Sequence, residues 1–321
     1  MGNKIILVTG DPNSVNSEIF FKCWKKLPKH IKKNIILISN YKLLKEQFKK
    51  LQYNLNLKKI KNIQDEKNEN DVKILDIKIA FTNPFKISKK SASDYVLKSL
   101  DLAHKLGLNS NVAGIINCPI NKNLLKKKYI GITEYFAAKC LVKNNSEVMI
   151  IKSKDLMVSP LTTHHDIKSI TKKINKKIII KKVSVIDAWY RKKFNKKPKI
   201  GILGLNPHNA ELRKFSEERR IIIPAIKKLQ KLKINSHGPL VADTIFINNF
   251  KNYDVIVGMY HDQVLAPFKA LYKFDAINLT LGLKYNRVSP DHGVAKDKIL
   301  SKKSNPNSLL NCIKYIHNCN R

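Results

Sequence analysis

Short apolar runs rich in β-branched residues alternate along this chain with segments of helical periodicity, and this alternation limits the fold more than any other feature. The runs that predict strands cover residues 4–9, 35–38, 112–116, 148–151, 178–180, 200–203, 255–257 and 276–281. Clear helical patterns cover residues 93–106, ended by Gly107, and residues 217–232. Strands that alternate with helices predict an α/β protein with a largely parallel sheet.

The chain is long enough for more than one domain. Its 321 residues are 43% hydrophobic and include only 11 glycines, so we expect a large core divided between two domains. Residues 53–73 are polar and aperiodic, which predicts an exposed excursion rather than a domain boundary.

The chain is strongly basic, with 62 Lys and Arg against 24 Asp and Glu and a net charge of +38. Such a surplus would suggest a nucleic-acid partner and steeply salt-dependent binding to any duplex. Only six of the 62 are Arg, so 56 are Lys, whereas phosphate and base recognition favours Arg for its bidentate guanidinium. We therefore interpret the lysines as solvated surface that attracts anionic substrates, and we expect no nucleic-acid partner.

The cysteine pattern and the apolar runs bear on the compartment. The five cysteines have no C-x-x-C spacing, which is typical of free thiols in a reducing cytoplasm. The chain opens directly on a strand-like run, which leaves no room for a signal peptide, and no apolar run approaches the roughly 20 residues that span a bilayer. We expect a cytoplasmic protein without membrane contact.

Three histidines stand where predicted strands give way to polar residues. His208 follows the run 200–203 and His261 follows the run 255–257, so both are expected at one edge of a sheet, where α/β enzymes keep their chemistry. His164 stands in the similar junction Thr162-Thr163-His164. Three neutral imidazoles would hold a divalent metal and leave positions open for a substrate. The alternative for any one of them is an ordinary surface or capping residue.

The chain has neither a G-x-G-x-x-G after a strand nor a G-x-x-x-x-G-K-[ST], so a standard dinucleotide-binding unit and a P-loop are both unsupported. Seven short motifs instead carry a resemblance over nearly the full length. In chain order these motifs are Gly131-Ile132-Thr133-Glu134, Thr162-Thr163-His164, Gly204-Leu205-Asn206-Pro207-His208, residues 238–244, Met259-Tyr260-His261-Asp262-Gln263, residues 278–283 and Asp291-His292-Gly293. Through them the chain resembles the 4-hydroxythreonine-4-phosphate dehydrogenase family of pyridoxal phosphate biosynthesis.

The resemblance implies a two-domain α/β/α fold of the isocitrate and isopropylmalate dehydrogenase type, with the active site in the interdomain cleft. One domain is expected from residues 1–130 plus 262–321, on the cofactor side, and the other from residues 131–261. The resemblance also implies a homodimer whose subunits share the active site, and one divalent metal bound by His164, His208 and His261. Zinc, cobalt, magnesium and manganese all remain open, although three imidazoles suit zinc or cobalt better.

The implied reaction oxidises the carbon-3 hydroxyl of 4-phosphohydroxy-L-threonine with NAD or NADP and is followed by loss of carbon dioxide. A metal on that hydroxyl would lower its pKa, polarise the new ketone and stabilise the enolate. By similarity the substrate contacts are Thr133, Lys269, Asn278 and Arg287. The candidate catalytic residues are Asp243, Lys269 and Asp262, with Asp243 and Asp262 as proton relays or partners of imidazole. A helix N-cap is the alternative for Asp243.

The missing glycine fingerprint is replaced, by similarity, with a loop that resembles the adenosine-binding loop of isopropylmalate dehydrogenases. That loop assigns the adenosine half of NAD or NADP to His292, Gly293, Asp297 and Asn305.

The chain also departs from the family pattern. Ile132 replaces a histidine that contacts the substrate, which removes a hydrogen bond worth roughly 1.5 to 3 kcal/mol. Glycines are lost at residues 13–17, after His208 and at residues 299–301. A paralogue that acts on D-threonate or D-erythronate 4-phosphate, and a non-catalytic descendant, are therefore the alternative hypotheses.

Overall fold

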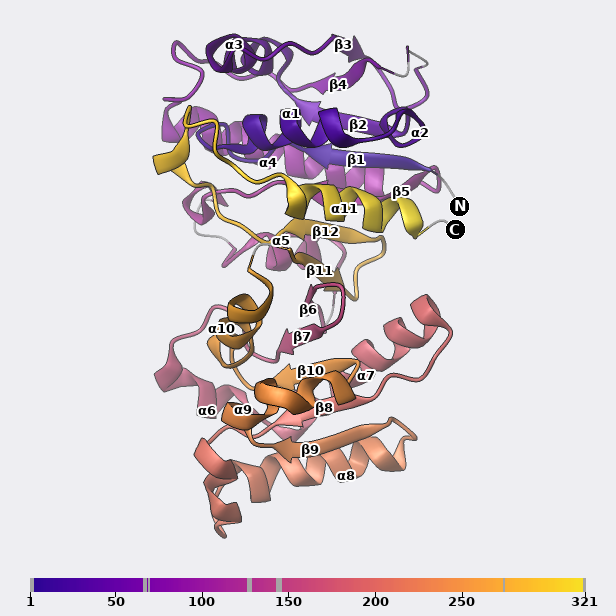
Figure 1. Ribbon diagram of the computed structural model, residues 1–321, viewed down its shortest axis with the longest axis vertical. Coiled ribbons are helices and arrows are strands. Elements are labelled where there is room, and N and C mark those ends of the chain that lie inside the picture. The colour runs from indigo at the N-terminus through magenta and orange to yellow at the C-terminus, as the bar shows by residue number, and fades with distance from the viewer. Residues whose placement is uncertain are drawn as a thin grey trace. The chain divides into compact units, whose positions relative to one another are not determined.

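The protein was analysed as a computed structural model that describes residues 3–319, apart from 66, 67, 69, 126–128, 143–145 and 274. The chain divides into two compact units (Figure 1). Unit 1 comprises residues 1–140 and 283–321, and unit 2 comprises residues 141–282. In the part of the chain described, no helix combines the length and apolarity that crossing a bilayer requires.

Unit 1 is a parallel sheet covered by helices on both faces. Its strands lie in the order β3-β4-β2-β1-β5-β12, and each pairs in parallel with its neighbour. The elements are β1 (Lys4–Val8), α1 (Asn16–Lys26), α2 (Lys29–Lys32), β2 (Ile35–Ser39), α3 (Tyr41–Leu51), β3 (Leu57–Ile60), β4 (Val72–Asp76), α4 (Lys89–Gly107), β5 (Val112–Asn117), α5 (Ile132–Lys139), β12 (Arg287–Pro290) and α11 (Asn307–Asn318).

The core of unit 1 follows from the alternation of side chains along its strands. One face of β1, β2 and β5 packs against the buried residues of α4 and α5, among them Tyr95, Leu100 and Phe136. Helices α1 and α11 pack against each other, and α11 also contacts β1, β5 and β12. Both faces of the strands are therefore apolar, as a covered parallel sheet requires.

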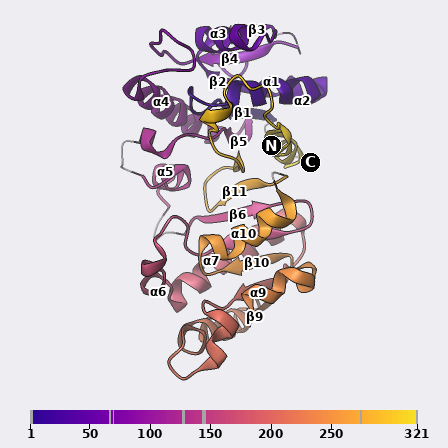
Figure 2. The same ribbon diagram turned by 60° about the vertical axis from the view of Figure 1, so that its left-hand side comes forward.

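Unit 2 contains a mixed sheet in the order β11-β6-β7-β10-β8-β9 (Figure 1), of which Figure 2 labels β11, β6, β10 and β9. Strand β6 is antiparallel to both neighbours, whereas β7, β10, β8 and β9 are parallel. The elements are β6 (Val148–Lys152), β7 (Met157–Pro160), α6 (Ile170–Lys173), α7 (Lys176–Phe194), β8 (Ile200–Leu203), α8 (Ile223–Lys231), β9 (Ser236–Leu240), α9 (Ala242–Thr244), β10 (Val255–Gly258), α10 (His261–Tyr272) and β11 (Ile277–Leu281).

The predicted mixed α/β class is confirmed, with two corrections to the predicted elements. Residues 178–180, predicted as a strand, lie in α7, where the Asn175 side chain accepts a hydrogen bond from Ile178 N and caps the helix. Residues 53–73 are not only an exposed excursion, because they contain β3 and the start of β4. The isoleucine run at 178–180 shows no helical periodicity in the sequence, and the lysine-rich segment 53–73 shows no strand periodicity.

The unit boundaries also differ from those expected after residues 130 and 261. Helix α5 belongs to unit 1 because Tyr135 and Phe136 join its core. Helix α10 and β11 belong to unit 2, since Phe268 packs into its core and β11 pairs with β6. The observed divisions therefore fall at 140/141 and 282/283.

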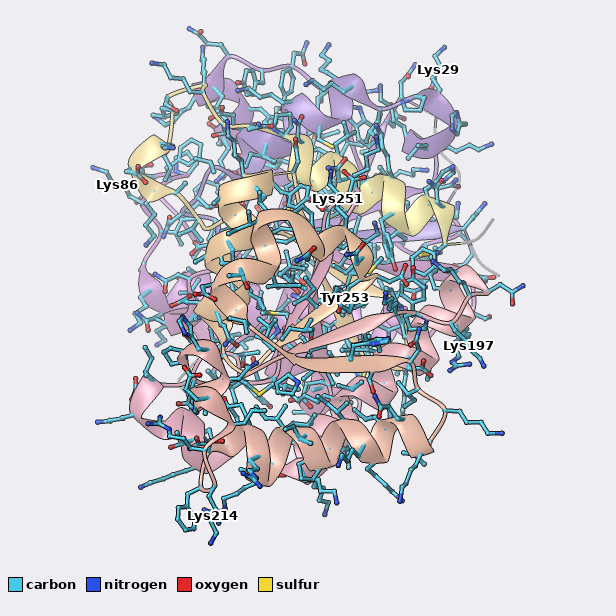
Figure 3. All side chains as sticks on the ribbon, turned by 60° about the horizontal axis from the view of Figure 1, so that its bottom comes forward. Lys29, Lys86, Lys197, Lys214, Lys251 and Tyr253 are labelled. Atoms are coloured by element: carbon cyan, nitrogen blue, oxygen red, sulfur yellow. The ribbon has the colours of Figure 1, made fainter. Side chains whose placement is uncertain are left out.

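Most of the described lysines lie on the surfaces of the two units, whereas Lys73 and Lys182 are buried. Lys29, Lys86, Lys197 and Lys214 are exposed and extend away from the ribbon (Figure 3). This distribution agrees with the interpretation of lysine as solvated surface.

Phe268→Ala is expected to lower the free energy of unfolding of unit 2 by about 3–5 kcal/mol, because it empties the place of a fully buried ring. The chain has two tryptophans, and only Trp189 lies in unit 2. Urea unfolding of a Trp24→Phe background, followed by Trp189 fluorescence, therefore measures unit 2. Leu271→Ala on the same helix, where Leu271 is 46% exposed, is the control. Equal losses for the two alanine variants would contradict burial as the cause.

Candidate active site

The three candidate histidines follow three neighbouring parallel strands of unit 2. His164 comes after β7, His261 begins α10 directly after β10, and His208 comes after β8. Strand β10 pairs in parallel with β7 on one side and with β8 on the other. The expectation that the strands deliver His208 and His261 to one sheet edge is therefore confirmed, and His164 follows the strand next to β10.

Hydrogen bonds tie the ends of these strands together. Leu161 N donates to Gly258 O at 2.8 Å, and the Thr162 hydroxyl donates to Met259 O at 2.8 Å. Gln263 accepts from Met259 N at 2.7 Å and donates to Gly204 O at 2.7 Å, which links the end of β10 to the end of β8. All three histidine loops are thus anchored through neighbouring backbone.

His164 and His261 lie close together, with ring centroids 5.7 Å apart. His261 Nδ1 lies 2.7 Å from Asp262 Oδ1. A carboxylate at Nδ1 fixes the tautomer and leaves Nε2 available to a metal or a substrate.

His208 has separate acidic neighbours. Its Nε2 lies 3.6 Å from Asp243 Oδ2 and its Nδ1 lies 3.7 Å from Glu211 Oε1. The His208 side chain is 67% exposed. Asp243 lies inside α9, whose N-cap is Val241, so the alternative role of Asp243 as an N-cap is not observed.

The donor chemistry of this edge suits a divalent metal, since imidazoles and carboxylates are ordinary ligands. The described residues of one chain do not gather such a site, however. Across the described residues no group of three histidine, cysteine, aspartate or glutamate side chains is placed to hold an ion.

Glu218 positions the loop that carries His208. Its carboxylate is fully buried and accepts hydrogen bonds from Leu205 N and Asn206 N, both at 2.8 Å. Burial alone would raise the pKa of Glu218, but these bonds and those from the Asn206 side chain hold the pKa below its usual range. The loop before His208 is therefore bound to a buried negative charge.

The loop itself turns in the left-handed sense. His208, Asn209, Ala210, Glu211 and Leu212 all have positive φ, between 46° and 56°. Such a conformation costs non-glycine residues roughly 1–2 kcal/mol each, so it needs anchors on both sides. One anchor is the Asn209 amide, which donates to Pro239 O at 3.0 Å and fills the space where a side chain on Gly204 would lie.

Two further candidate substrate residues belong to unit 2. Lys269 is exposed on α10. Asn278 lies on β11, and its Oδ1 is buried without a hydrogen-bond partner in the described part of the chain. An unpaired buried acceptor is costly, so a ligand donor at Asn278 would relieve that cost.

Unit 1 brings the other two candidate substrate residues together. Arg287 is 3% exposed, and its Nη1 donates to Thr133 Oγ1 at 3.3 Å. Its Nε donates to Asn117 Oδ1 at 2.7 Å, and its guanidinium carbon lies 5.8 Å from the Phe136 ring centroid. Burial lowers the pKa of Arg287 to about 10, which still leaves it charged at neutral pH. Arg287 is therefore a buried arginine and not part of the exposed surface.

Thr133 lies at the start of α5, where backbone N–H groups are unpaired by the helix itself. A buried arginine beside a helix N-terminus attracts phosphate or carboxylate. Ile132, in contrast, packs against the apolar core of unit 1. Its side chain offers no hydrogen-bond donor to an anion.

The candidate cofactor residues all lie in unit 1, between β12 and α11. His292 is half-buried, with Nδ1 2.9 Å from Gly293 O, and Gly293 faces open space. Asp297 is exposed on a 3-10 turn, and the exposed Asn305 accepts from Asn307 N at 2.9 Å.

Sequence reasoning missed the side chains that hold these residues in place. Asn117 directly follows the predicted strand 112–116, which is a usable signal, but nothing local marks it as the partner of Arg287. Gln263 stands beside His261 in a quoted motif, yet its link to Gly204 appears only in the folded sheet. Glu218 was expected simply as part of a helix.

The fold and the polar groups at the strand ends define the class, a mixed α/β protein with an enzyme-like site at the carboxyl ends of parallel strands. Residues 31–316 match the family model described as pyridoxal phosphate biosynthetic protein PdxA. The chain belongs to this family.

Individual relatives cover nearly the whole chain. It is 36% identical over 319 residues to a 4-hydroxythreonine-4-phosphate dehydrogenase from Sulfurihydrogenibium sp., covering 97% of this chain and 96% of that protein. It is 31% identical to a provisionally named D-threonate 4-phosphate dehydrogenase from Oceanobacillus iheyensis, covering 91% and 90%. The crystal structure of a 4-hydroxythreonine-4-phosphate dehydrogenase from Klebsiella pneumoniae superposes with a TM-score of 0.86 at 26% identity, covering 99% and 98%.

Glu218→Gln is expected to lower the free energy of unfolding of unit 2 by about 1–3 kcal/mol at pH 7. Because the folded state holds the pKa of Glu218 below its ordinary value of 4.5, the stabilisation is complete above that pH and declines as the pH falls through the folded pKa. Urea unfolding at a series of pH values, followed by Trp189 fluorescence, measures the difference.

Glu217→Gln is the matched control, because Glu217 accepts a single bond from the Asn206 side chain at 2.8 Å. It should cost clearly less than Glu218→Gln. A wild-type advantage over Glu218→Gln that grows on acidification would contradict the assigned role.

Proposed function

We propose that this protein is a 4-hydroxythreonine-4-phosphate dehydrogenase. It oxidises 4-phosphohydroxy-L-threonine at carbon 3 to 2-amino-3-oxo-4-phosphooxybutanoate, which loses carbon dioxide to give 3-amino-2-oxopropyl phosphate. Within a chain of this family, the observation that carries the proposal is the set of three histidines that follow adjacent parallel strands.

The groups that do the redox chemistry come from outside the chain. His164, His208 and His261 would hold a divalent metal, which would acidify the hydroxyl and polarise the ketone, and bound NAD or NADP would supply the acceptor for the hydride from carbon 3. Asp262 orients the His261 imidazole through their 2.7 Å contact.

The remaining residues bind the charged substrate and accept its proton. Arg287 and Thr133 form a preorganised pair for an anionic group, since Asn117 already fixes the guanidinium. Asn278 supplies an unpaired acceptor, and Lys269 supplies a second positive charge. Asp243, 3.6 Å from His208, is the proposed general base.

The cofactor is assigned to unit 1. His292, Gly293, Asp297 and Asn305 contact the adenosine half of NAD or NADP in this proposal. All five cysteines are free, which suits a reducing cytoplasm.

The replacement of histidine by Ile132 keeps a second substrate in consideration. Ile132 packs on the core and leaves one donor fewer near Thr133. A D-threonate 4-phosphate dehydrogenase is the alternative function, favoured by this substitution and by the 31% identical relative.

NADH formation by the purified protein tests the function. Turnover of 4-phosphohydroxy-L-threonine is expected, with loss of activity on adding a chelator and a fall of at least about 100-fold in His208→Ala. His237→Ala is the matched control, because His237 contacts Asn235 rather than a candidate site residue.

Phosphorylated D-threonate serves as the competing substrate. Exclusive turnover of that compound would establish the alternative function. Silence on both substrates with either cofactor would make the protein a non-catalytic descendant.

We also propose that the protein is a homodimer in which each metal site takes histidines from both subunits, because one chain gathers no complete ligand set among its described residues. His208→Ala and His261→Ala are each expected to be inactive. If His208 and His261 of one site come from different subunits, random mixing restores about a quarter of the sites.

Mixing the variants after reversible dissociation, followed by an activity assay, measures this complementation. Mixing two preparations of His208→Ala is the control. No recovery in confirmed mixed dimers would show that both histidines of a site come from the same chain.

A further inference from the structure

The first turn of α1 carries a carboxylate that is bound to a distant part of unit 1. Glu18 is 1% exposed. Its Oε1 accepts from the backbone N of Ser304 at 2.8 Å and from Lys22 Nζ at 2.8 Å. A buried charge needs such partners, so Glu18 and the backbone at Ser304 depend on each other.

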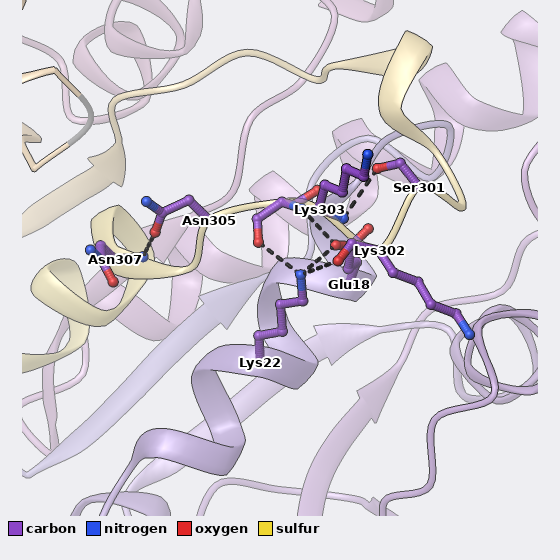
Figure 4. A network of polar contacts seen from close by, with 8 residues as sticks. Glu18, Lys22, Ser301, Lys302, Lys303, Asn305 and Asn307 are labelled. Atoms are coloured by element: carbon purple, nitrogen blue, oxygen red, sulfur yellow. Dashed lines mark hydrogen bonds and ion pairs between the residues drawn. The ribbon is translucent and has the colours of Figure 1, made fainter.

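Lys22, one helical turn after Glu18, closes the same connection from its other side (Figure 4). Its ammonium group donates to Lys302 O at 2.7 Å and to Ser304 O at 2.9 Å, in addition to Glu18. An ammonium group has three protons, so all three are used. Together Glu18 and Lys22 form a clamp on the backbone of residues 302–304.

The clamped segment has an unfavourable backbone conformation. Leu300 and Lys302 have φ of 67° and 58°, in a region where glycine is favoured and side chains cause strain. The backbone bonds of Ile299 and Ser301 reach back only to Lys296 and Lys298. The Lys302 ammonium adds one tether, to Gln52 Oε1 at 2.7 Å. The segment therefore depends on side chains from elsewhere for its shape.

The position of this segment gives the clamp a functional meaning. It joins Asp297 to Asn305, two of the exposed residues assigned to the adenosine half of the cofactor. Asn305 is itself fixed to the start of α11 through Asn307 N. The clamp therefore binds the backbone segment that connects these two residues.

We propose that Glu18 and Lys22 are positioning residues for the dinucleotide cofactor, an inference that rests on the proposed function. They hold residues 300–304 in the one conformation that presents Asp297 and Asn305 together. Neither residue needs to touch the cofactor. Without the clamp, the segment would have to be ordered at the moment of binding, and affinity would fall.

Direct binding of NAD and NADP to the full-length protein, measured by calorimetry, tests the inference. Lys22→Met keeps the aliphatic stem and removes all three donors, and it is expected to weaken binding of the preferred cofactor about tenfold. Lys22→Arg retains donors and should stay within about threefold of the wild type. Glu18→Gln, which keeps the shape of the side chain, is a second variant expected to weaken binding.

Lys26→Met is the matched control, because it removes the same charge from the same helix at an exposed position. Its cofactor affinity should equal that of the wild type. Hydrogen exchange adds a local readout, in which Lys22→Met speeds exchange at residues 299–304 and leaves the amides of α4 unchanged.

Wild-type affinity in Lys22→Met, or an equal loss in Lys26→Met, would overturn the inference. Faster exchange throughout unit 1 with unchanged affinity would also overturn it, because the clamp would then be only structural. A wild-type protein that binds neither NAD nor NADP is a separate outcome. It would overturn the proposed function, and this inference with it, before any variant is compared.

Discussion

The parallel hydrogen bonding of β7, β10 and β8 is the constraint on which the rest of the candidate site depends. Parallel strands end at the same edge of a sheet, so the chain leaves all three in the same direction. The histidines that follow are separated by many residues in sequence but belong to adjacent strands. The side chains of Thr162 and Gln263 hydrogen-bond to the backbone of the neighbouring loop, and these bonds fix the loops that follow the adjacent strands.

In the loop at residues 13–17, side chains that hydrogen-bond to backbone groups take the place of glycine. Asn13 exchanges two hydrogen bonds with Ile87, and Asn16 donates to Thr9 O and Pro119 O at 2.9 Å each. The family resemblance noted in the sequence leads to the expectation of glycines at residues 13–17. Amide side chains can satisfy the polar groups of a tight turn, so the lost glycines need not mean a lost site.

Hydrogen bonds between side chains and loops also explain the buried charges. Glu218, Glu18 and Arg287 are each nearly inaccessible, and each binds a loop or a neighbouring polar side chain rather than solvent. A buried charge is costly unless it is hydrogen-bonded, so each one favours the loop conformation that supplies its partners. Lysine dominates the surface of this chain, so these buried charges, rather than the surface charges, determine which loop conformations are favoured.

The sequence by itself determined the α/β class, most strands, and the motifs that place histidines after strands, because apolar periodicity and strand-end polarity are local properties. The resemblance to the family also gave Arg287 and Thr133 as separate candidate substrate contacts, and only the folded structure brings them together. Only the tertiary structure decided that 178–180 is helical and that the unit boundaries fall at 140/141 and 282/283. It also decided that Asn117 bonds to Arg287 and that Gln263, Glu218 and Lys22 bond to the backbone of loops. Those outcomes depend on contacts between residues far apart in the chain, which a local pattern does not encode.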